Sequence, residues 1–238
     1  MLGTLYGVGV GPGDPDLLTL KAVKILGRVG HVFAASSSSN DYSLALEIVR
    51  DHLREGVPVH FLDFPMTFDK DHLEKAWSAN CDTVAARLES GVDVAFLTLG
   101  DPMTFSTFIY LWRKIRNRLP SVPVEIVPGI TSYQAAAACA GVALAEAEET
   151  LTIISGAKGG RRLSEVLPFS DNVVLMKAYK QFPQILEQIR LLGLQDAVCF
   201  VSRCGLEGQV VEKDFDALQD LKPHYLSLLI LKKGGNSP

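Results

Sequence analysis

Three short loops rich in glycine and proline carry the residues of this chain whose types and spacing suit the binding of a ligand. They are Gly9-Val-Gly-Pro-Gly-Asp-Pro15, Gly100-Asp-Pro102 and Val127-Pro-Gly-Ile-Thr-Ser132. Glycine has no side chain to hold a ligand away from the backbone, so backbone groups in such loops approach a ligand closely. Asp101 and Thr131 add a carboxylate and a hydroxyl that are able to hold polar groups. The loops therefore predict a binding site built largely from backbone.

Each of these loops follows a predicted strand. Residues 92–99 form a nearly unbroken apolar run, which is typical of a strand buried on both faces of a parallel sheet. Pro102 stops that strand and keeps Asp101 away from helical backbone angles. Because open α/β sheets bind ligands at the carboxyl ends of their strands, we expect the three loops to meet at one edge of a sheet.

The order of predicted elements indicates two α/β domains. Strands at 4–10, 30–35, 57–62, 92–99 and 122–129 alternate with helices at 15–26, 42–53, 71–88 and 105–119, with Asp14 as N-cap of the first helix and a polar loop at 36–39. Farther on we expect helices at 132–140, 183–192 and 214–221, and strands at 150–154, 172–176, 197–201, 205–211 and 225–231. The prediction is an N-terminal domain, 1–128, with a parallel sheet and glycine-rich loops, and a C-terminal domain, 129–238, with a mixed sheet.

Composition narrows the class of protein. The chain has 238 residues, 47% of them apolar, and a net charge of −4, which disfavours a nucleic-acid partner. No apolar run is long enough to span a membrane, and no basic segment precedes an apolar one at the start, so we expect a cytoplasmic protein. The four cysteines lack C-x-x-C or zinc-site spacing, which predicts reduced thiols and no metal site, with Cys139 a small core residue.

An oxidoreductase with a nicotinamide cofactor is one alternative for a strand, glycine loop and helix. Neither Gly7-x-Gly9-x-x-Pro12 nor Gly9-x-Gly11-x-x-Asp14 completes the dinucleotide fingerprint, and no G-K-[ST] follows the loop. Asp14 at the helix start also occupies the positive helix end that would otherwise attract a phosphate. The first loop is therefore expected to contact something other than pyrophosphate.

Taken in order, the motifs resemble the tetrapyrrole (corrin/porphyrin) methylase family, also called class III methyltransferases. The three loops above carry most of the resemblance, and Phe64-Pro-Met-Thr67, Leu97-Thr-Leu-Gly-Asp-Pro-Met103, Ser106-Thr-Phe108 and Arg203-Cys-Gly-Leu-Glu-Gly-Gln209 add to it. The resemblance implies the class III methyltransferase fold, two α/β domains with a ligand trough between them. It also implies a homodimer and S-adenosylmethionine as cofactor, converted to S-adenosylhomocysteine.

Carried over position by position, the family's cofactor contacts are nine residues: Pro12, Leu99, Gly100, Asp101, Thr104, Thr131, Ser132, Met176 and Gly205. Met176 offers adenine a soft apolar surface. Alone, Met176 would equally suit a strand core, and Gly205 a turn.

Within the family the motifs most resemble the enzymes that methylate C-20 of precorrin-2 or cobalt-precorrin-2 in cobalamin biosynthesis. Arg203 and Lys177 are candidates to bind carboxylate arms of this tetrapyrrole, and no metal ligand is assigned. Related enzymes have an acid/base Asp where this chain has Ala34-Ala-Ser36, so the catalytic residues stay unassigned. Two alternatives remain, a methylase of another corrin intermediate and a non-catalytic tetrapyrrole-binding protein.

Overall fold

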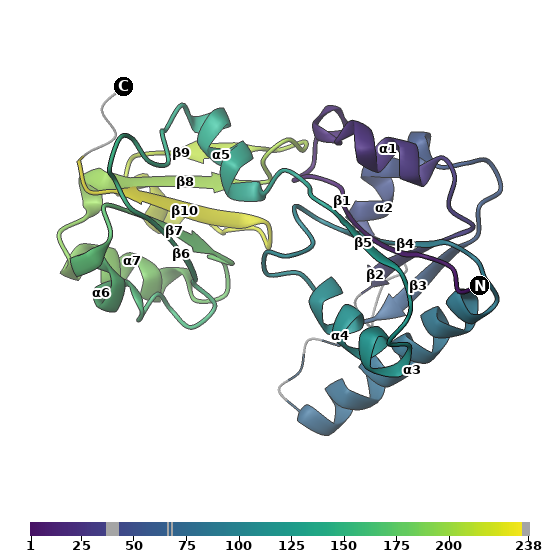
Figure 1. Ribbon diagram of the computed structural model, residues 1–238. Coiled ribbons are helices and arrows are strands. Elements are labelled where there is room, and N and C mark those ends of the chain that lie inside the picture. Colours follow the sequence, from purple (N-terminus) through teal and green to yellow (C-terminus); the bar gives the residue numbers. More distant parts are fainter. Residues whose placement is uncertain (37–42, 66, 68, 235–238) are drawn as a thin grey trace. The chain divides into compact units, whose positions relative to one another are not determined.

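The computed structural model describes residues 1–36, 43–65, 67 and 69–234, and it divides into two compact units (Figure 1). Unit 1 is Met1–Thr131 and unit 2 is Ser132–Pro238, compared with the boundary between residues 128 and 129 expected above. Each unit has a five-stranded sheet and hydrophobic clusters of its own. Residues 37–39 of the predicted polar loop lie outside the described part of the chain.

Unit 1 contains an all-parallel sheet of order β3-β2-β4-β1-β5, and the apolar run singled out in the sequence is its central strand. The strands are β1 Leu5–Gly9, β2 His31–Ser36, β3 Val59–Asp63, β4 Val94–Thr98 and β5 Val124–Val127. Gly9 pairs with Thr98, and Val8 pairs with Val127, so β1, β4 and β5 end at the same level. The predicted parallel sheet is confirmed.

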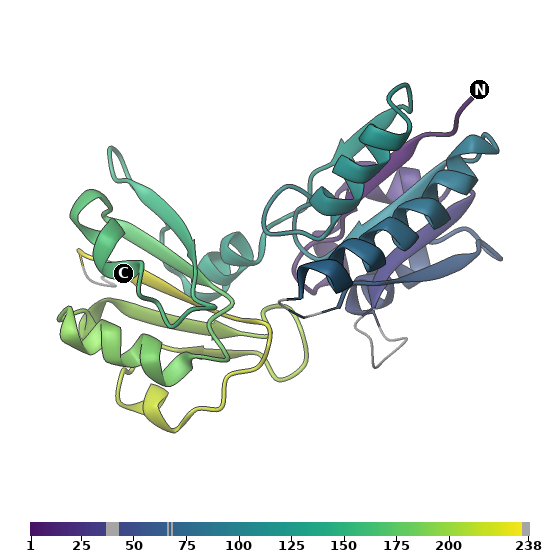
Figure 2. The same cartoon turned by 90° about the horizontal axis from the view of Figure 1, so that it is seen from below.

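Helices cover both faces of this sheet, as Figure 2 shows. The helices of unit 1 are α1 Leu20–Leu26, α2 Leu44–Val49, α3 Lys70–Glu89 and α4 Phe108–Arg118. Phe96 and its neighbours on one face pack against α3 and α4, whereas Leu97 and its neighbours on the other face pack against α1 and α2. Alternate residues of a strand point to opposite faces, and here both faces are apolar because both are covered.

The first helix begins later than predicted. Pro15–Leu17 is a short 3-10 turn capped by Asp14, and α1 begins after Thr19, whose hydroxyl accepts the Ala22 N–H at 3.2 Å. Thr19 is an N-cap that competes with Asp14, and extended backbone at Leu18 separates the two turns. The helix predicted at 214–221 is likewise only a 3-10 turn, Ala217–Asp220.

Unit 2 contains a mixed sheet of order β6-β7-β10-β8-β9, as the sequence predicted. The strands are β6 Leu151–Ser155, β7 Asn172–Met176, β8 Val198–Ser202, β9 Val210–Glu212 and β10 Ser227–Lys232. β6 and β7 are parallel, and β10 runs antiparallel between β7 and β8. The carboxyl ends of β7 and β8 therefore lie beside the start of β10, since Met176 pairs with Leu228 and Ser202 with Ser227.

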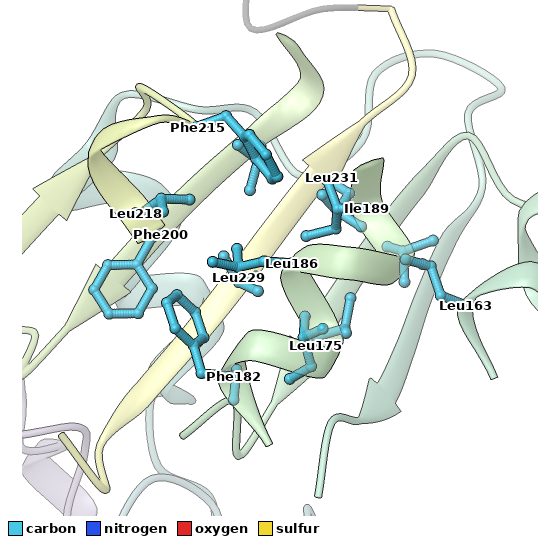
Figure 3. Close-up of a cluster of buried hydrophobic side chains, with 14 of the residues drawn as sticks. Leu163, Leu175, Phe182, Leu186, Ile189, Phe200, Phe215, Leu218, Leu229 and Leu231 are labelled. Carbon is cyan, nitrogen blue, oxygen red and sulfur yellow. The ribbon is translucent and has the colours of Figure 1, made fainter. Parts of the chain in front are cut away.

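The two faces of the unit 2 sheet are packed by different helices. α5 Ser132–Ala140 covers one face with alanines, and Cys139 on this helix, expected in the core, is exposed. α6 Leu163–Val166 and α7 Phe182–Leu191 cover the other face. Figure 3 shows that larger cluster, in which Phe182, Leu186 and Ile189 of α7 point toward Leu229 and Leu231 of β10. The short helix α6 was not predicted.

A pair of histidines links β2 and β3 of unit 1. His31 Nδ1 lies 2.7 Å from His60 Nε2, and the His60 ring stacks on Phe33 with 4.9 Å between ring centroids. Partial burial lowers the pKa of both imidazoles, and the neighbouring Arg87 guanidinium lowers them further. The His60 ring also disfavours a positive charge on His31, so the pair is most stable when at least one ring is neutral.

This pair makes the stability of unit 1 depend on pH. Because folding lowers both pKa values below about 6.5, the folded chain binds fewer protons than the unfolded chain in mild acid. The stabilising contribution is therefore present above about pH 6.5 and is lost as the pH falls through the lowered values. We expect His60→Phe, which keeps the stack on Phe33, to flatten the fall in the urea midpoint between about pH 7 and about pH 5.

Tryptophan fluorescence measures this effect, because both tryptophans, Trp77 and Trp112, lie in unit 1. The control is His72→Gln at an exposed position in the first turn of α3, and it should keep the pH dependence of the original chain. Identical pH profiles for His60→Phe and the original chain would contradict the assignment.

Candidate functional site

The three loops predicted to meet at one edge do so in unit 1. They leave the carboxyl ends of β1, β4 and β5, which are neighbours in the sheet. Gly11 and Gly100 exchange two backbone hydrogen bonds, of 3.3 Å and 2.7 Å, so the first and second loops form a bridge beyond the sheet. Both glycines have positive φ, +78° and +66°, which glycine adopts at little cost.

A direct contact between backbones joins the second and third loops. A Cβ added to Gly129 would lie 2.1 Å from the Gly100 carbonyl oxygen and 2.8 Å from the Gly9 carbonyl carbon. A Cβ added to Gly9 would lie 2.6 Å from both the Gly100 oxygen and the Gly129 nitrogen. We call Gly9, Gly100 and Gly129 the glycine contact. Only residues without side chains fit there.

The Asp101 side chain stabilises the glycine contact through two hydrogen bonds. One carboxylate oxygen accepts the Gly129 N–H at 3.2 Å, and the other accepts the Met103 N–H at 2.8 Å. The sequence predicted Asp101 as a ligand contact and missed this structural role, because its backbone partner lies 28 residues away in the chain. Thr104 follows, and its N–H donates to the Asp101 carbonyl at 3.3 Å.

The other predicted cofactor residues of unit 1 lie in the same three loops. Leu99 is partly exposed, whereas Pro12 and Thr131 are buried. Six predicted cofactor contacts therefore belong to loops at the same edge of one sheet.

Phe105 is a feature that the sequence did not signal. It was predicted as the first residue of a helix, but α4 begins at Phe108, and Phe105 has a left-handed backbone with φ +53°. For a bulky residue this conformation costs about 1–2 kcal/mol. The residue is nevertheless 46% exposed.

In unit 2, the predicted residues lie at the edge formed by the ends of β7 and β8. The Ser132 hydroxyl, at the start of α5, lies 3.8 Å from the Met176 sulfur at the end of β7, so these two predicted cofactor contacts are neighbours. Gly205 is exposed in the turn after β8, with φ +74°, and its N–H donates to the Gln209 side chain at 2.8 Å.

Two cationic residues turn the chain at this edge. Lys177 directly follows β7 and Arg203 directly follows β8, and both have left-handed backbones, with φ of +61° and +52°. The Arg203 N–H donates to the Leu226 carbonyl at 2.9 Å, and the next residue after Lys177, Ala178, donates to the Ser227 carbonyl at 3.1 Å. Non-glycine residues in strained backbone conformations cluster at functional sites, so these positions favour a role in binding.

Arg203 has a further property of a binding residue. Its Nε atom is buried and has no hydrogen-bond partner among the described residues. The guanidinium lies along Gly208, because a Cβ added there would be 3.7 Å from its Cζ and Nη1 atoms. A buried cationic donor without a partner is costly, and a carboxylate from a ligand would satisfy it.

Tyr179 and Tyr225 lie close to this edge, with ring centroids 5.2 Å apart in an edge-to-face arrangement. Although the Tyr225 residue is 51% exposed, partial desolvation and the neighbouring Tyr179 raise the pKa of its hydroxyl, which is therefore a neutral donor at physiological pH. No motif in the sequence signalled either tyrosine.

Among the described residues, no group of three or more His, Cys, Asp or Glu side chains is arranged to hold a metal ion. No helix in the described ranges is long and apolar enough to cross a membrane.

This fold is found in methyltransferases of solved structure. The cobalt precorrin-4 methyltransferase CbiF matches with a TM-score of 0.76 and 22% identity over 99% of this chain and 96% of that one. Uroporphyrin-III C-methyltransferase from Thermus thermophilus, solved with S-adenosylhomocysteine, matches with a TM-score of 0.66 and 24% identity over 97% of this chain and 98% of that one.

The chain belongs to the tetrapyrrole (corrin/porphyrin) methylase family, whose model matches residues 4–217. The cobalt-precorrin-2 C(20)-methyltransferase of Salmonella typhimurium is 36% identical over 98% of both chains. The probable cobalt-precorrin-2 C(20)-methyltransferase of Methanocaldococcus jannaschii is 36% identical over 96% of both chains. A precorrin-2 C(20)-methyltransferase from a Sinorhizobium species is 30% identical over 96% of this chain and 95% of that one.

The glycine contact predicts a large effect of one methyl group. Gly129→Ala places a Cβ 2.1 Å from the Gly100 oxygen, so the two loops must separate and strain unit 1 by about 1–3 kcal/mol. The matched control is Gly27→Ala, where φ is −69° and the added Cβ is 3.6 Å from the Val23 carbonyl oxygen. Urea unfolding followed by tryptophan fluorescence should give a lower midpoint for Gly129→Ala alone; equal midpoints would show that the loops separate without cost.

Proposed function

We propose that this protein transfers a methyl group from S-adenosylmethionine to C-20 of precorrin-2 or cobalt-precorrin-2 in cobalamin biosynthesis. The observation that carries the proposal is the identity of 36%, along 98% of both chains, to a relative named cobalt-precorrin-2 C(20)-methyltransferase. The coverage matters because both units are matched. A match to the strand-end loops alone would indicate a methylase without indicating its substrate.

The residues of both units fit S-adenosylmethionine. The glycine contact leaves a stretch of backbone clear of side chains, and Thr104 and Thr131 add hydroxyls beside it. In unit 2 the paired Ser132 and Met176 offer a hydroxyl next to a soft apolar surface, which suits an adenine ring. We therefore assign cofactor binding to the nine residues predicted from the sequence, with Asp101 acting chiefly by holding its loop.

The chemistry requires positioning more than a protein nucleophile. Bound S-adenosylmethionine supplies an electrophilic methyl group, and the electron-rich meso carbon C-20 of the macrocycle is the nucleophile. Holding two reactants in line contributes as much as about 7–11 kcal/mol in well-oriented systems. The loops fixed by the glycine contact and Asp101 supply this rigidity. The methylated carbon later releases one proton, for which water is the acceptor in this scheme.

The carboxylate arms of the substrate require cations on a chain whose net charge is −4. Arg203 and Lys177 follow the ends of β8 and β7, the two strands on either side of β10, and the buried Nε of Arg203 has no partner among the described residues. We assign both residues to substrate binding, with Arg203 making the stronger, bidentate contact.

We further propose that the enzyme is a homodimer, as its resemblance to the family implies, and that it acts in the cytoplasm. Light scattering coupled to size-exclusion chromatography tests the dimer. A monomer at assay concentration would contradict that part of the proposal and leave the reaction unaffected.

Mass spectrometry of reaction mixtures tests the reaction. The protein is incubated with S-adenosylmethionine and precorrin-2, with and without inserted cobalt. We expect a product heavier by one methyl group, formed in step with S-adenosylhomocysteine, and the preferred macrocycle identifies the substrate. Asp101→Ala should lower the rate, because it frees the Gly129 and Met103 amides. If the cofactor binds and neither macrocycle is methylated, the enzyme acts on another corrin intermediate. If the macrocycle binds and no turnover follows, the protein is a tetrapyrrole carrier.

Substitution of Arg203 tests substrate binding separately. Arg203→Lys keeps the charge and loses the bidentate geometry, so we expect KM for the macrocycle to rise about tenfold while the Kd of S-adenosylhomocysteine stays the same. The control is Arg190→Lys on α7, where the arginine pairs with Glu187 at 3.5 Å. A rise in KM for both variants would point to a general electrostatic effect.

A further inference from the structure

Phe105 combines a strained backbone with a partly exposed aromatic ring. A left-handed backbone is unfavourable for any residue with a Cβ, and folding usually places a bulky residue there only when the surroundings require it. Burial in the core does not explain this case, since the residue is 46% exposed.

Hydrogen bonds on both sides of Phe105 impose the conformation. On one side, Asp101 accepts the Met103 N–H at 2.8 Å, and its carbonyl accepts the Thr104 N–H at 3.3 Å. On the other side, the buried Ser106 hydroxyl lies 2.8 Å from the Thr98 hydroxyl and accepts the Phe108 N–H at 3.1 Å. Hydrogen bonds therefore hold the loop directly before and after Phe105.

A second apolar side chain is exposed in the same loop. Met103 is 45% exposed although its N–H is fixed by Asp101. Both side chains lie within five residues of Gly100, at the carboxyl edge of the unit 1 sheet. Exposed apolar side chains on a rigid loop beside a binding site are suited to contact a ligand.

We propose that Phe105, with Met103 beside it, contacts the flat apolar face of the tetrapyrrole substrate and is a specificity-determining residue of the methylase. The inference rests on the proposed function for the identity of the substrate. The macrocycle fits better than the cofactor, because its face is large and mostly apolar, the amino-acid and ribose parts of the cofactor are polar, and the adenine ring is assigned to Met176 of unit 2. An aromatic ring stacked against such a face also excludes water from the reacting carbon.

The test uses a substitution that relieves strain. Phe105→Gly removes the ring and suits the left-handed backbone, so it should not lower the urea midpoint of unit 1 measured by tryptophan fluorescence. We expect KM for the macrocycle to rise about tenfold, with the calorimetric Kd of S-adenosylhomocysteine unchanged. Phe105→Tyr keeps an aromatic ring and should retain the original KM.

Ala147→Gly is the matched control. Ala147 is an exposed residue of unit 2 with φ +46°, so the same relief of strain should leave both binding constants unchanged. Quenching of tryptophan fluorescence by uroporphyrin, a stable octacarboxylate tetrapyrrole, measures macrocycle binding without turnover.

The outcomes separate this inference from the proposed function. Weaker uroporphyrin binding by Phe105→Gly supports the contact even if the original chain does not methylate precorrin-2. Unchanged KM and unchanged uroporphyrin binding would overturn it. Weaker binding of S-adenosylhomocysteine with unchanged macrocycle binding would also overturn the inference, because it would assign the ring to the cofactor. A loss of dimer with macrocycle binding unchanged would assign the ring to a second copy of the chain and overturn it as well.

Discussion

The unit 1 site depends on a contact between backbones that excludes side chains. Gly9, Gly100 and Gly129 approach so closely that a single Cβ at Gly129 would overlap the Gly100 oxygen. Because the three residues follow neighbouring strands, this contact fixes the height at which all three loops leave the sheet. Asp101 then joins two of the loops through its two oxygens. This arrangement joins the three loops that carry the predicted cofactor residues of this unit.

Unit 2 achieves a similar result by different means. Its strand ends are turned by Lys177 and Arg203, residues for which a left-handed backbone is unfavourable, and both turns are held by hydrogen bonds to the chain entering β10. Glycine would form these turns at lower cost and would supply no charge. The conformational cost accompanies a cationic side chain at each strand end, which suits a substrate that carries several carboxylates.

Much of this could be predicted from the sequence, because glycine and proline act locally. The loops and the central strand follow from apolar runs stopped by Gly-Asp-Pro or Pro-Gly, the mixed second sheet follows from its apolar strand-like runs, and α5 and β7 have the predicted bounds. What could not be predicted depends on partners remote in sequence. Asp101 bonds to Gly129, and Phe105 is strained by anchors at Thr98 and Ser106, which no local propensity encodes. The late start of α1 depends on Thr19, which caps the helix five residues after Asp14, the N-cap that was predicted.

The position of β10 in its sheet has a consequence for the folding of the chain during its synthesis. β7 and β8 do not pair with each other, and the strand that joins them is made after both. Until residues 227–232 appear, the α7 face and the α5 face of unit 2 lack their middle strand, and their apolar residues stay open to chaperones or to mispairing. In unit 1 the strand β1, which lies between β4 and β5 in the sheet, is synthesised before both of them. Unit 1 can therefore complete its sheet during synthesis, whereas unit 2 completes its own only after its last strand is made.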